Sequence, residues 1–394
     1  MWNPHAAPAG DLGNMVLEPV EVLYEYDGPV IFRAKAGLVD LLLSKISEHE
    51  KVSRYLSCTT NNDSVEALKS GRLSVYGALD RDSFWIIDID AQARVQRYWN
   101  CARDDVPGRF FPKPGLGLFH WQGAVPDTLE QSSAILALKF RGAELTEHGI
   151  PLGKLKELID QTFSTIRKIL TPPQLANTRS STFDVEVAPL KFASLVIAIK
   201  EPVINMQAIG RIKSLRKYTK EDIEAEVRAR SGEFVRKLQE VSMFTRTGIF
   251  HEGYAEANFV FLDTLSELLP DENGTISSIE FNGPTEHGTA TVIFDQKASD
   301  IVRKLSESTR GKSVTETGFI AGMMIKAQTI KITSLRGKDV TCVFSHEYYD
   351  KLLENERFKV RSRVKLKGQL TRRPRVDLMQ VDEIEFIDDF NLFD

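Results

Sequence analysis

The chain has 394 residues, of which 42% are hydrophobic and 27% are charged. This composition excludes the disordered, collagen-like and fibrous classes of protein, and the length predicts two or three domains that each bury a core of their own. The net charge of -4 excludes a protein that is basic overall, although it is compatible with a local basic patch.

Cysteine and histidine usage predicts neither disulfides nor a metal site. Cys58, Cys101 and Cys342 are far apart in the sequence, and the seven histidines show no two-ligand spacing for zinc. The N-terminal residues lack a basic stretch followed by an apolar run, and no segment has the length and apolar character of a membrane span. We therefore expect a cytoplasmic protein with no cofactor and no membrane partner.

The N-terminal region is predicted to be rich in strands. Residues 20–26 and 30–33 have strand patterns on either side of Asp27-Gly28-Pro29, and these turn residues predict a β-hairpin. Further strands are expected over residues 38–46, 54–59 and 84–89.

One short helix and a loop complete this region. Asn62, Asp63 and Ser64 supply a cap for a helix over residues 65–69, which Gly71 ends. Residues 107–126 are dense in proline and glycine, which predicts a loop or linker. We therefore assign residues 1–125 to an N-terminal β-rich domain.

The central region mixes helices and strands. Apolar residues recur at helical spacing between Pro151 and Pro172, and Thr219 with Asp222 forms a capping-box pattern before a helix that reaches residue 242. These features predict an α+β domain at residues 126–313. The other expected elements are a strand over 195–199, a helix over 254–269, a hairpin over 277–294 and a helix over 298–306.

The C-terminal region, residues 314–394, has the clearest strand pattern. Three strands, a helix and two further strands resemble an oligonucleotide-binding (OB) barrel, and an SH3-like barrel is the alternative. Gly318 and Gly322 suit the bend that the first strand of such a barrel needs. The chain is thus predicted to be a multidomain α+β protein. The expected strands cover residues 315–325, 329–333, 340–344, 358–370 and 376–386, and the helix covers 346–353.

The fourth of these strands carries a basic stripe. Cations occupy every second position from Lys359 to Lys367, so on a strand they point to one face. Three arginines extend the stripe into the next loop, and residues 351–375 hold ten basic and two acidic residues. The basic stripe consists of Lys359, Arg361, Arg363, Lys365, Lys367, Arg372, Arg373 and Arg375.

The basic stripe suits the phosphate backbone of DNA or RNA. The second and third strands offer no exposed aromatic residue for base stacking, which favours backbone contact. Two other interpretations stay open, in which the charges keep an edge strand soluble or contact an acidic protein partner. Residues 376–394 carry seven acids and no base. Their end, residues 388–394, could fold back onto the stripe, serve as an acidic and aromatic docking peptide, or fray.

Two groups of acidic residues have side chains that could bind a divalent metal ion. Asp88 and Asp90 share one face of a strand, where a solvated pair at the strand end is the favoured interpretation. Glu280 with Asp295 and Lys297 has a spacing similar to that of metal-dependent nucleases, but a helix cap explains Asp295 equally well. We therefore expect no catalytic residues and no metal site, with a metal-dependent nuclease as the weakest alternative.

Three motifs of the N-terminal region carry a resemblance to a known family. They are Leu23-Tyr24-Glu25-Tyr26-Asp27-Gly28-Pro29, Ala67-Leu68-Lys69-Ser70-Gly71-Arg72-Leu73-Ser74 and Phe84-Trp85-Ile86-Ile87-Asp88. On these motifs, residues 20–90 resemble an uncharacterised bacterial domain family that begins with a Tyr-Asp-Gly-Pro hairpin. The resemblance covers about a fifth of the chain and implies a link to mobile or antiviral defence loci, without catalytic residues to carry over.

Together these features predict a non-catalytic nucleic-acid-binding protein of a bacterial antiviral defence system, which contacts phosphate backbone through the basic stripe. The main alternative is a protein–protein adaptor or scaffold of a defence complex. Formation of a homo-oligomer is compatible with both.

Overall fold

The structure is a computed structural model with helices and several sheets. The chain divides into two compact units: residues 1–133 with 287–291 form the first unit, and residues 134–286 with 292–394 form the second unit. None of the helices in the described part of the chain has the length and apolar character needed to cross a membrane. The structure describes residues 2–3, 5, 7–10, 15–49, 52–120, 123–145, 149–172, 175, 182–189, 195–212, 215–270, 276–285, 288–309, 311–373 and 375–387.

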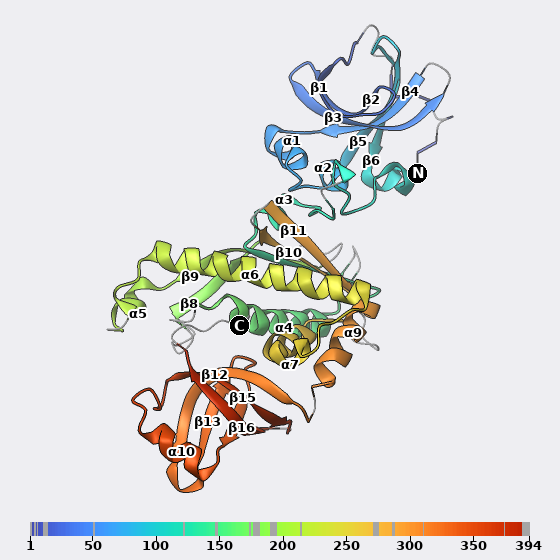
Figure 1. The fold of residues 1–394 in the computed structure, drawn as a ribbon. Coiled ribbons are helices and arrows are strands. Elements are labelled where there is room, and N and C mark those ends of the chain that lie inside the picture. The colour runs from blue at the N-terminus through green and yellow to red at the C-terminus, as the bar shows by residue number, and fades with distance from the viewer. Residues whose placement is uncertain are drawn as a thin grey trace. The chain divides into compact units, whose positions relative to one another are not determined.

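An antiparallel sheet of six strands, arranged in sequence order, forms the body of the first unit (Figure 1). The predicted hairpin is confirmed, and Asp27 and Gly28 in its turn have φ angles of 50° and 99°. The three further predicted strands are also confirmed, and a sixth strand follows that the sequence pattern does not predict. The strands are β1 (Pro19–Glu25), β2 (Pro29–Ala36), β3 (Val39–His49), β4 (Val52–Thr59), β5 (Ser83–Asp90) and β6 (Val95–Ala102).

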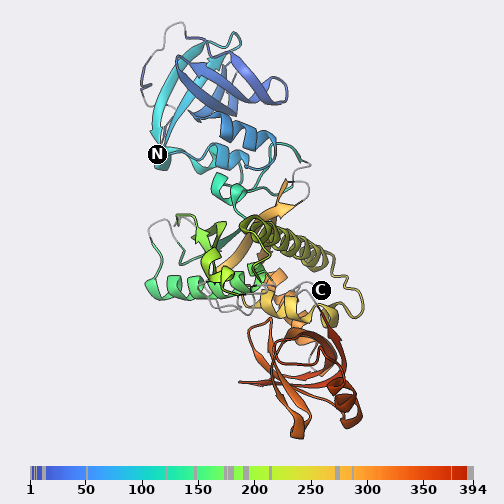
Figure 2. The ribbon, with the colours of Figure 1, turned by 90° about the vertical axis from the view of Figure 1, so that its left-hand side faces the viewer.

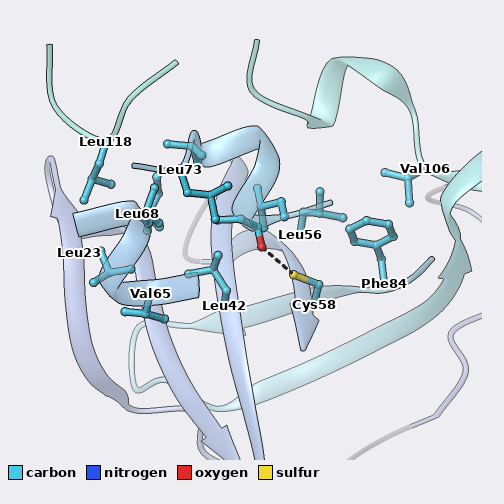
Figure 3. Close-up of a cluster of buried hydrophobic side chains, with 14 of the residues drawn as sticks. Leu23, Leu42, Leu56, Cys58, Val65, Leu68, Leu73, Phe84, Val106 and Leu118 are labelled. Atoms are coloured by element: carbon cyan, nitrogen blue, oxygen red, sulfur yellow. Dashed lines mark hydrogen bonds between the residues drawn. The ribbon is translucent and has the colours of Figure 1, made fainter. Parts of the chain in front are cut away.

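Two short helices, α1 (Asn62–Lys69) and α2 (Val75–Ala78), cover one face of this sheet. Helix α1 begins three residues earlier than predicted, because the side chain of Asn61 caps it by accepting a hydrogen bond from the Ser64 backbone N–H at 2.8 Å. Figure 3 shows the resulting core, in which Val65 and Leu68 of α1 lie against Leu42 of the sheet.

The proline- and glycine-rich segment 107–126 is a loop that packs on the same core. Leu118 from this loop is buried in the cluster (Figure 3). The buried carboxylate of Asp127 accepts hydrogen bonds from the Gly115 backbone N–H at 2.6 Å and from the Ser74 hydroxyl at 2.7 Å. These contacts tie the loop to the first unit, which continues through α3 (Leu129–Ser133).

The second unit contains a five-stranded sheet in the order β11-β10-β7-β9-β8, with the long helix α6 (Lys220–Thr247) packed on β10 and β9 (Figures 1 and 2). The predicted hairpin corresponds to β10 and β11, whereas β7 and β8 are not predicted from the sequence. The strands are β7 (Leu136–Gly142), β8 (Phe183–Val187), β9 (Leu195–Ile204), β10 (Ile276–Thr285) and β11 (Gly288–Asp295).

Local sequence signals explain the helices of this unit. The capping box predicted for α6 is confirmed, since the Thr219 side chain accepts from the Asp222 N–H and the Asp222 carboxylate accepts from the Thr219 N–H. A Cβ atom at Gly283 of β10 would lie 2.6 Å from Val235 Cγ2, so only glycine lets α6 approach the sheet this closely.

The remaining helices follow the sequence patterns with one break. The helix predicted over 254–269 is interrupted at Asn258. The helices are α4 (Leu152–Leu170), α5 (Met206–Gly210), α7 (Tyr254–Ala257), α8 (Phe259–Ser266) and α9 (Gln296–Glu307).

The C-terminal part of the second unit is a closed five-stranded barrel in the order β12-β13-β14-β16-β15. The first strand pairs with the second and the fourth, the third runs parallel to the fifth, and α10 (His346–Leu353) lies between the third and fourth in sequence. The predicted order of five strands and one helix is therefore confirmed. The strands are β12 (Ser313–Met324), β13 (Thr329–Ser334), β14 (Asp339–Val343), β15 (Arg363–Thr371) and β16 (Asp377–Phe386).

Candidate nucleic-acid interface

Strand β15 turns three cations of the basic stripe to the outside of the barrel. Val364 and Leu366 are fully buried inside it, and because side chains alternate across a strand, the residues between and beside them face outward. Lys367 is exposed, whereas Arg363 and Lys365 are half-buried. The outward row on β15 is Arg363, Lys365 and Lys367.

Lys359 and Arg361 do not belong to this row, because β15 begins at Arg363 and not at residue 358 as predicted. Residues 359–362 form a turn in which the Ser362 N–H donates to the Lys359 carbonyl at 3.0 Å, and Arg361 has a φ angle of 75°. The Arg361 N–H donates to the Ile320 carbonyl of β12 at 2.7 Å, which fixes the turn. Both side chains are exposed, so they flank the strand.

Acidic residues of β16 oppose the outward row. In the antiparallel register, Glu385 lies opposite Lys365 and Glu383 lies opposite Lys367. Opposite charges placed directly across two strands attract one another and contribute roughly 0.2 to 1 kcal/mol per pair. The three cations of β15 therefore share their face of the barrel with two carboxylates, which offset part of the positive charge. The run of cations in the sequence does not reveal these carboxylates.

Arg372 is engaged in holding the barrel to the helices of the second unit. Its guanidinium donates to the Asp263 carboxylate of α8 at 3.0 Å and to the Ser306 hydroxyl of α9 at 3.3 Å. It also lies over the Phe259 ring, 5.1 Å from the ring centroid. Arg372 is thus placed as a structural contact, beside a pocket of about 550 Å³ that it lines together with Phe259 and Thr371.

Arg373 and Arg375, in contrast, are exposed in the loop between β15 and β16. The Arg373 backbone N–H donates to the Asp377 carboxylate at 2.9 Å, which shapes the loop while leaving the guanidinium group outside this contact. The exposed cations of the predicted stripe are therefore Lys359, Arg361, Lys367, Arg373 and Arg375.

A buried ionic cluster lies where this loop meets the turn between β13 and β14. Arg336, which is 2% exposed, donates to Glu316 at 2.6 Å, to Asp377 at 3.0 Å and to Asp263 at 3.1 Å. Its guanidinium also lies over the Phe259 ring at 4.9 Å. The cluster links β12, β16 and α8, and so it fixes the barrel on the rest of the second unit.

The charges of this cluster are nearly balanced. Arg336 and Arg372 carry two positive charges, and Glu316, Asp377 and Asp263 carry three negative ones. Burial raises the pKa of Glu316, and the Arg336 guanidinium opposes that rise. The sequence does not reveal this cluster, because the three carboxylate partners of Arg336 lie in other elements and no local pattern joins them.

The acidic residues considered above as possible metal ligands, Asp88 and Asp90, have structural partners. Asp88 is not part of a solvated pair as predicted, because it is buried and receives hydrogen bonds from Arg54 at 2.6 and 2.9 Å and from Arg97 at 2.6 Å. Burial alone would raise the pKa of Asp88, but the two arginines hold it below its usual value. Asp90 accepts from the backbone N–H groups of Gln92 and Arg94 in the turn that follows.

The nuclease-like group is likewise explained by local structure. Glu280 is buried and pairs with Arg141 at 2.9 Å, and Asp295 caps α9 by accepting from the Ala298 N–H at 2.8 Å. Lys297 is exposed on the first turn of α9. Within the described part of the chain, no three His, Cys, Asp or Glu side chains are grouped so as to hold a metal ion.

Comparisons of the chain with protein-family models, curated proteins and solved structures found no match.

Proposed function

We propose that the C-terminal barrel is an OB-like module that binds the phosphate backbone of nucleic acid. Support comes from its strand order, with the helix between the third and fourth strands, because small barrels of this architecture bind oligonucleotides. The observation that carries the proposal is the group of cations on β15 and its two flanking turns.

The exposed members of the basic stripe supply the contacts. Lys367 stands on the strand, Lys359 and Arg361 lie in the turn before it, and Arg373 and Arg375 lie in the loop after it. Flexible, fully charged side chains of this kind suit phosphate oxygens. Glu383 and Glu385 weaken the field of the outward row, so the two turns contribute more of the affinity than the strand itself.

The contacts are to the backbone and not to bases. The outward positions of β13 and β14 include Lys331, Thr333 and Thr341, and the Lys331 ammonium already pairs with Asp339 at 2.6 Å. Base recognition by stacking needs exposed aromatic side chains at such positions. Binding is therefore expected to depend little on nucleotide sequence. The resemblance of residues 20–90 to a bacterial family leads us to propose that this binding serves an antiviral defence system.

Binding of the full chain to labelled single- and double-stranded DNA and RNA across a salt series tests the proposal. If five cations meet phosphates, log K falls with log salt with a slope of about -3.5 on single strands. The variant Lys367→Glu, Arg373→Glu, Arg375→Glu is expected to lose the interaction at moderate salt. Magnesium is included in a parallel series, because cleavage would favour the nuclease alternative.

A matched control makes the same charge change elsewhere. Arg211→Glu, Lys217→Glu, Arg228→Glu alters three exposed cations outside the barrel and is expected to bind as the unmodified chain does. Loss of binding in this control alone would move the site to the central region. Absence of binding by the unmodified chain at low salt would overturn the proposal and favour an adaptor that binds a protein partner.

A further inference from the structure

A groove of about 520 Å³ lies in the first unit, between the first three strands and the loop that follows β6. Val30, Ile31 and Ile46 line it from the strands, and Phe110, Phe111 and Phe119 line it from the loop. This volume is within the range of small-molecule sites, about 300 to 1,000 Å³. The groove has no part in the proposed function of the barrel.

The loop wall of the groove is fixed by contacts within the first unit. The Phe111 ring packs edge-on against Phe84 at 5.3 Å, and the Phe110 ring packs against Trp2 at 5.4 Å. The Val75 N–H donates to the Leu116 carbonyl at 2.9 Å, next to the contact of Gly115 with Asp127. The wall is therefore formed before any ligand arrives, which lowers the entropy cost of binding.

Incompletely buried apolar side chains gather at this groove. The first unit has two clusters of buried hydrophobic residues. The cluster that includes α1 and α2 has six partly buried hydrophobic residues packed against it among the described residues, and five of them line the groove, namely Val30, Ile46, Phe110, Phe111 and Phe119. Tyr24 and Leu116, also in the lining, are 39% and 53% exposed. A ligand with an apolar body would remove this surface from water.

The lining of the groove contains basic side chains and no acidic ones among its described residues. Lys45, Arg109 and His120 line the groove, and none of the described lining residues is an acid. Lys45 pairs with Glu48, but the Arg109 guanidinium stacks on the Phe110 ring at 5.6 Å and pairs with no carboxylate of the described residues. Arg109 thus offers its hydrogen-bond donors to an anionic group held beside the aromatic wall.

We propose that this groove binds a small organic anion, in which an aromatic or aliphatic body enters between the strands and the loop and an acidic group meets Arg109. The aromatic rings supply the apolar contact, and the charge of Arg109 selects an anion over a cation of the same shape. The ligand class is fixed by these two features together.

Calorimetric titration of the full chain with two matched probes tests the proposal. Naphthalene-1-acetate and 1-naphthalenemethylamine share one aromatic body and carry opposite charges. The acetate is expected to bind at least tenfold more tightly than the amine, because charge-assisted hydrogen bonds add to the apolar contact. Arg109→Gln is expected to abolish this preference, and Ile46→Trp is expected to weaken both probes by filling the groove.

Arg94→Gln serves as the control, because Arg94 is exposed on the first unit and does not line the groove. A benzophenone carboxylate, crosslinked and mapped by mass spectrometry, is expected to label peptides that contain residues 109–119. The proposal is overturned if neither probe binds, if both bind equally to the unmodified chain, or if the crosslinks map outside the groove. None of these outcomes bears on nucleic-acid binding by the barrel.

Discussion

Replacing Arg336 by methionine is expected to destabilise the second unit strongly. The substitution keeps most of the side-chain volume but removes the guanidinium that Glu316, Asp377 and Asp263 share. Glu316 and Asp377 are 0% and 1% exposed, so water cannot replace the lost hydrogen bonds without opening the barrel. The variant therefore leaves two buried carboxylates without their main partner.

Removing one member of a buried ion pair costs about 3 to 5 kcal/mol, which is a large part of the total stability of a folded domain. With a urea dependence of about 3 kcal/mol per molar, the midpoint of unfolding is expected to fall by about 1 M or more. The deficit relative to the unmodified chain is expected to shrink as the pH falls. Burial raises the pKa of Glu316 in the folded state, so protonation at low pH relieves the variant.

The two units can be followed separately in one urea titration of the full chain. All four tryptophans of the sequence fall within residues 1–133, the N-terminal range of the first unit, so tryptophan fluorescence follows that part of the chain. Far-UV circular dichroism reports on both units. We expect the dichroism transition of Arg336→Met to move to lower urea while the fluorescence transition stays in place.

Two results would refute this reasoning. An unchanged dichroism transition would mean that the buried cluster adds nothing to stability, and an equal shift of both transitions would mean that the units do not unfold separately. Lys359→Met removes one exposed cation of the barrel and serves as the control, with an expected change within about 0.5 kcal/mol.

One further substitution in each unit tests a buried contact of that unit. Asp88→Asn is expected to destabilise the first unit by about 3 kcal/mol, since it removes the buried charge that Arg54 and Arg97 share. The pKa of Asp88 is lowered in the folded state, so the stability that its charge contributes is present at neutral pH and is lost as the pH falls. The urea midpoints of the variant and the unmodified chain, followed by fluorescence, should therefore converge in acid. A difference between the two midpoints that stays constant with pH would contradict this. Gly283→Ala is expected to cost the second unit about 1 to 3 kcal/mol, because its Cβ would clash with Val235. Gly232→Ala is the control, since the nearest atom to its Cβ is 3.5 Å away, and equal dichroism midpoints for the two variants would argue against the close approach of α6.

Features encoded by neighbouring residues were predictable from the sequence. The Asp27-Gly28 turn, the Thr219–Asp222 capping box and the order of elements in the barrel each depend on short stretches of chain. Strand β6, with Gln96 and Arg97 side by side near its start, has no clear strand alternation, and β8 has only five residues. Strand β7 is buried along most of its length, and such apolar runs do not distinguish strand from helix.

The candidate site also combines features that the local sequence predicts with features that depend on distant parts of the chain. The outward row of β15 follows from the alternation of side chains along a strand and was predictable. The turn at 359–362 depends on pairing with Ile320, about 40 residues earlier, and no local sequence pattern predicts that pairing. The opposition of Glu383 and Glu385 to the lysines depends on the register of β15 against β16, which a bulge between Lys367 and Gly368 sets. Long-range pairing therefore places most of the exposed cations in the two turns that flank β15, with Lys367 on the strand itself.

The position of Asp377 in the chain has a consequence for how the protein folds during synthesis. Asp377 opens the last strand of the barrel, and that strand pairs with β14 and β15. Until that strand has emerged from the ribosome, Arg336 lacks one of its carboxylates and the barrel cannot close, so β12 to β15 form an open sheet with free edges. The barrel and its ionic cluster are thus expected to form in one late step, in which a single strand completes both.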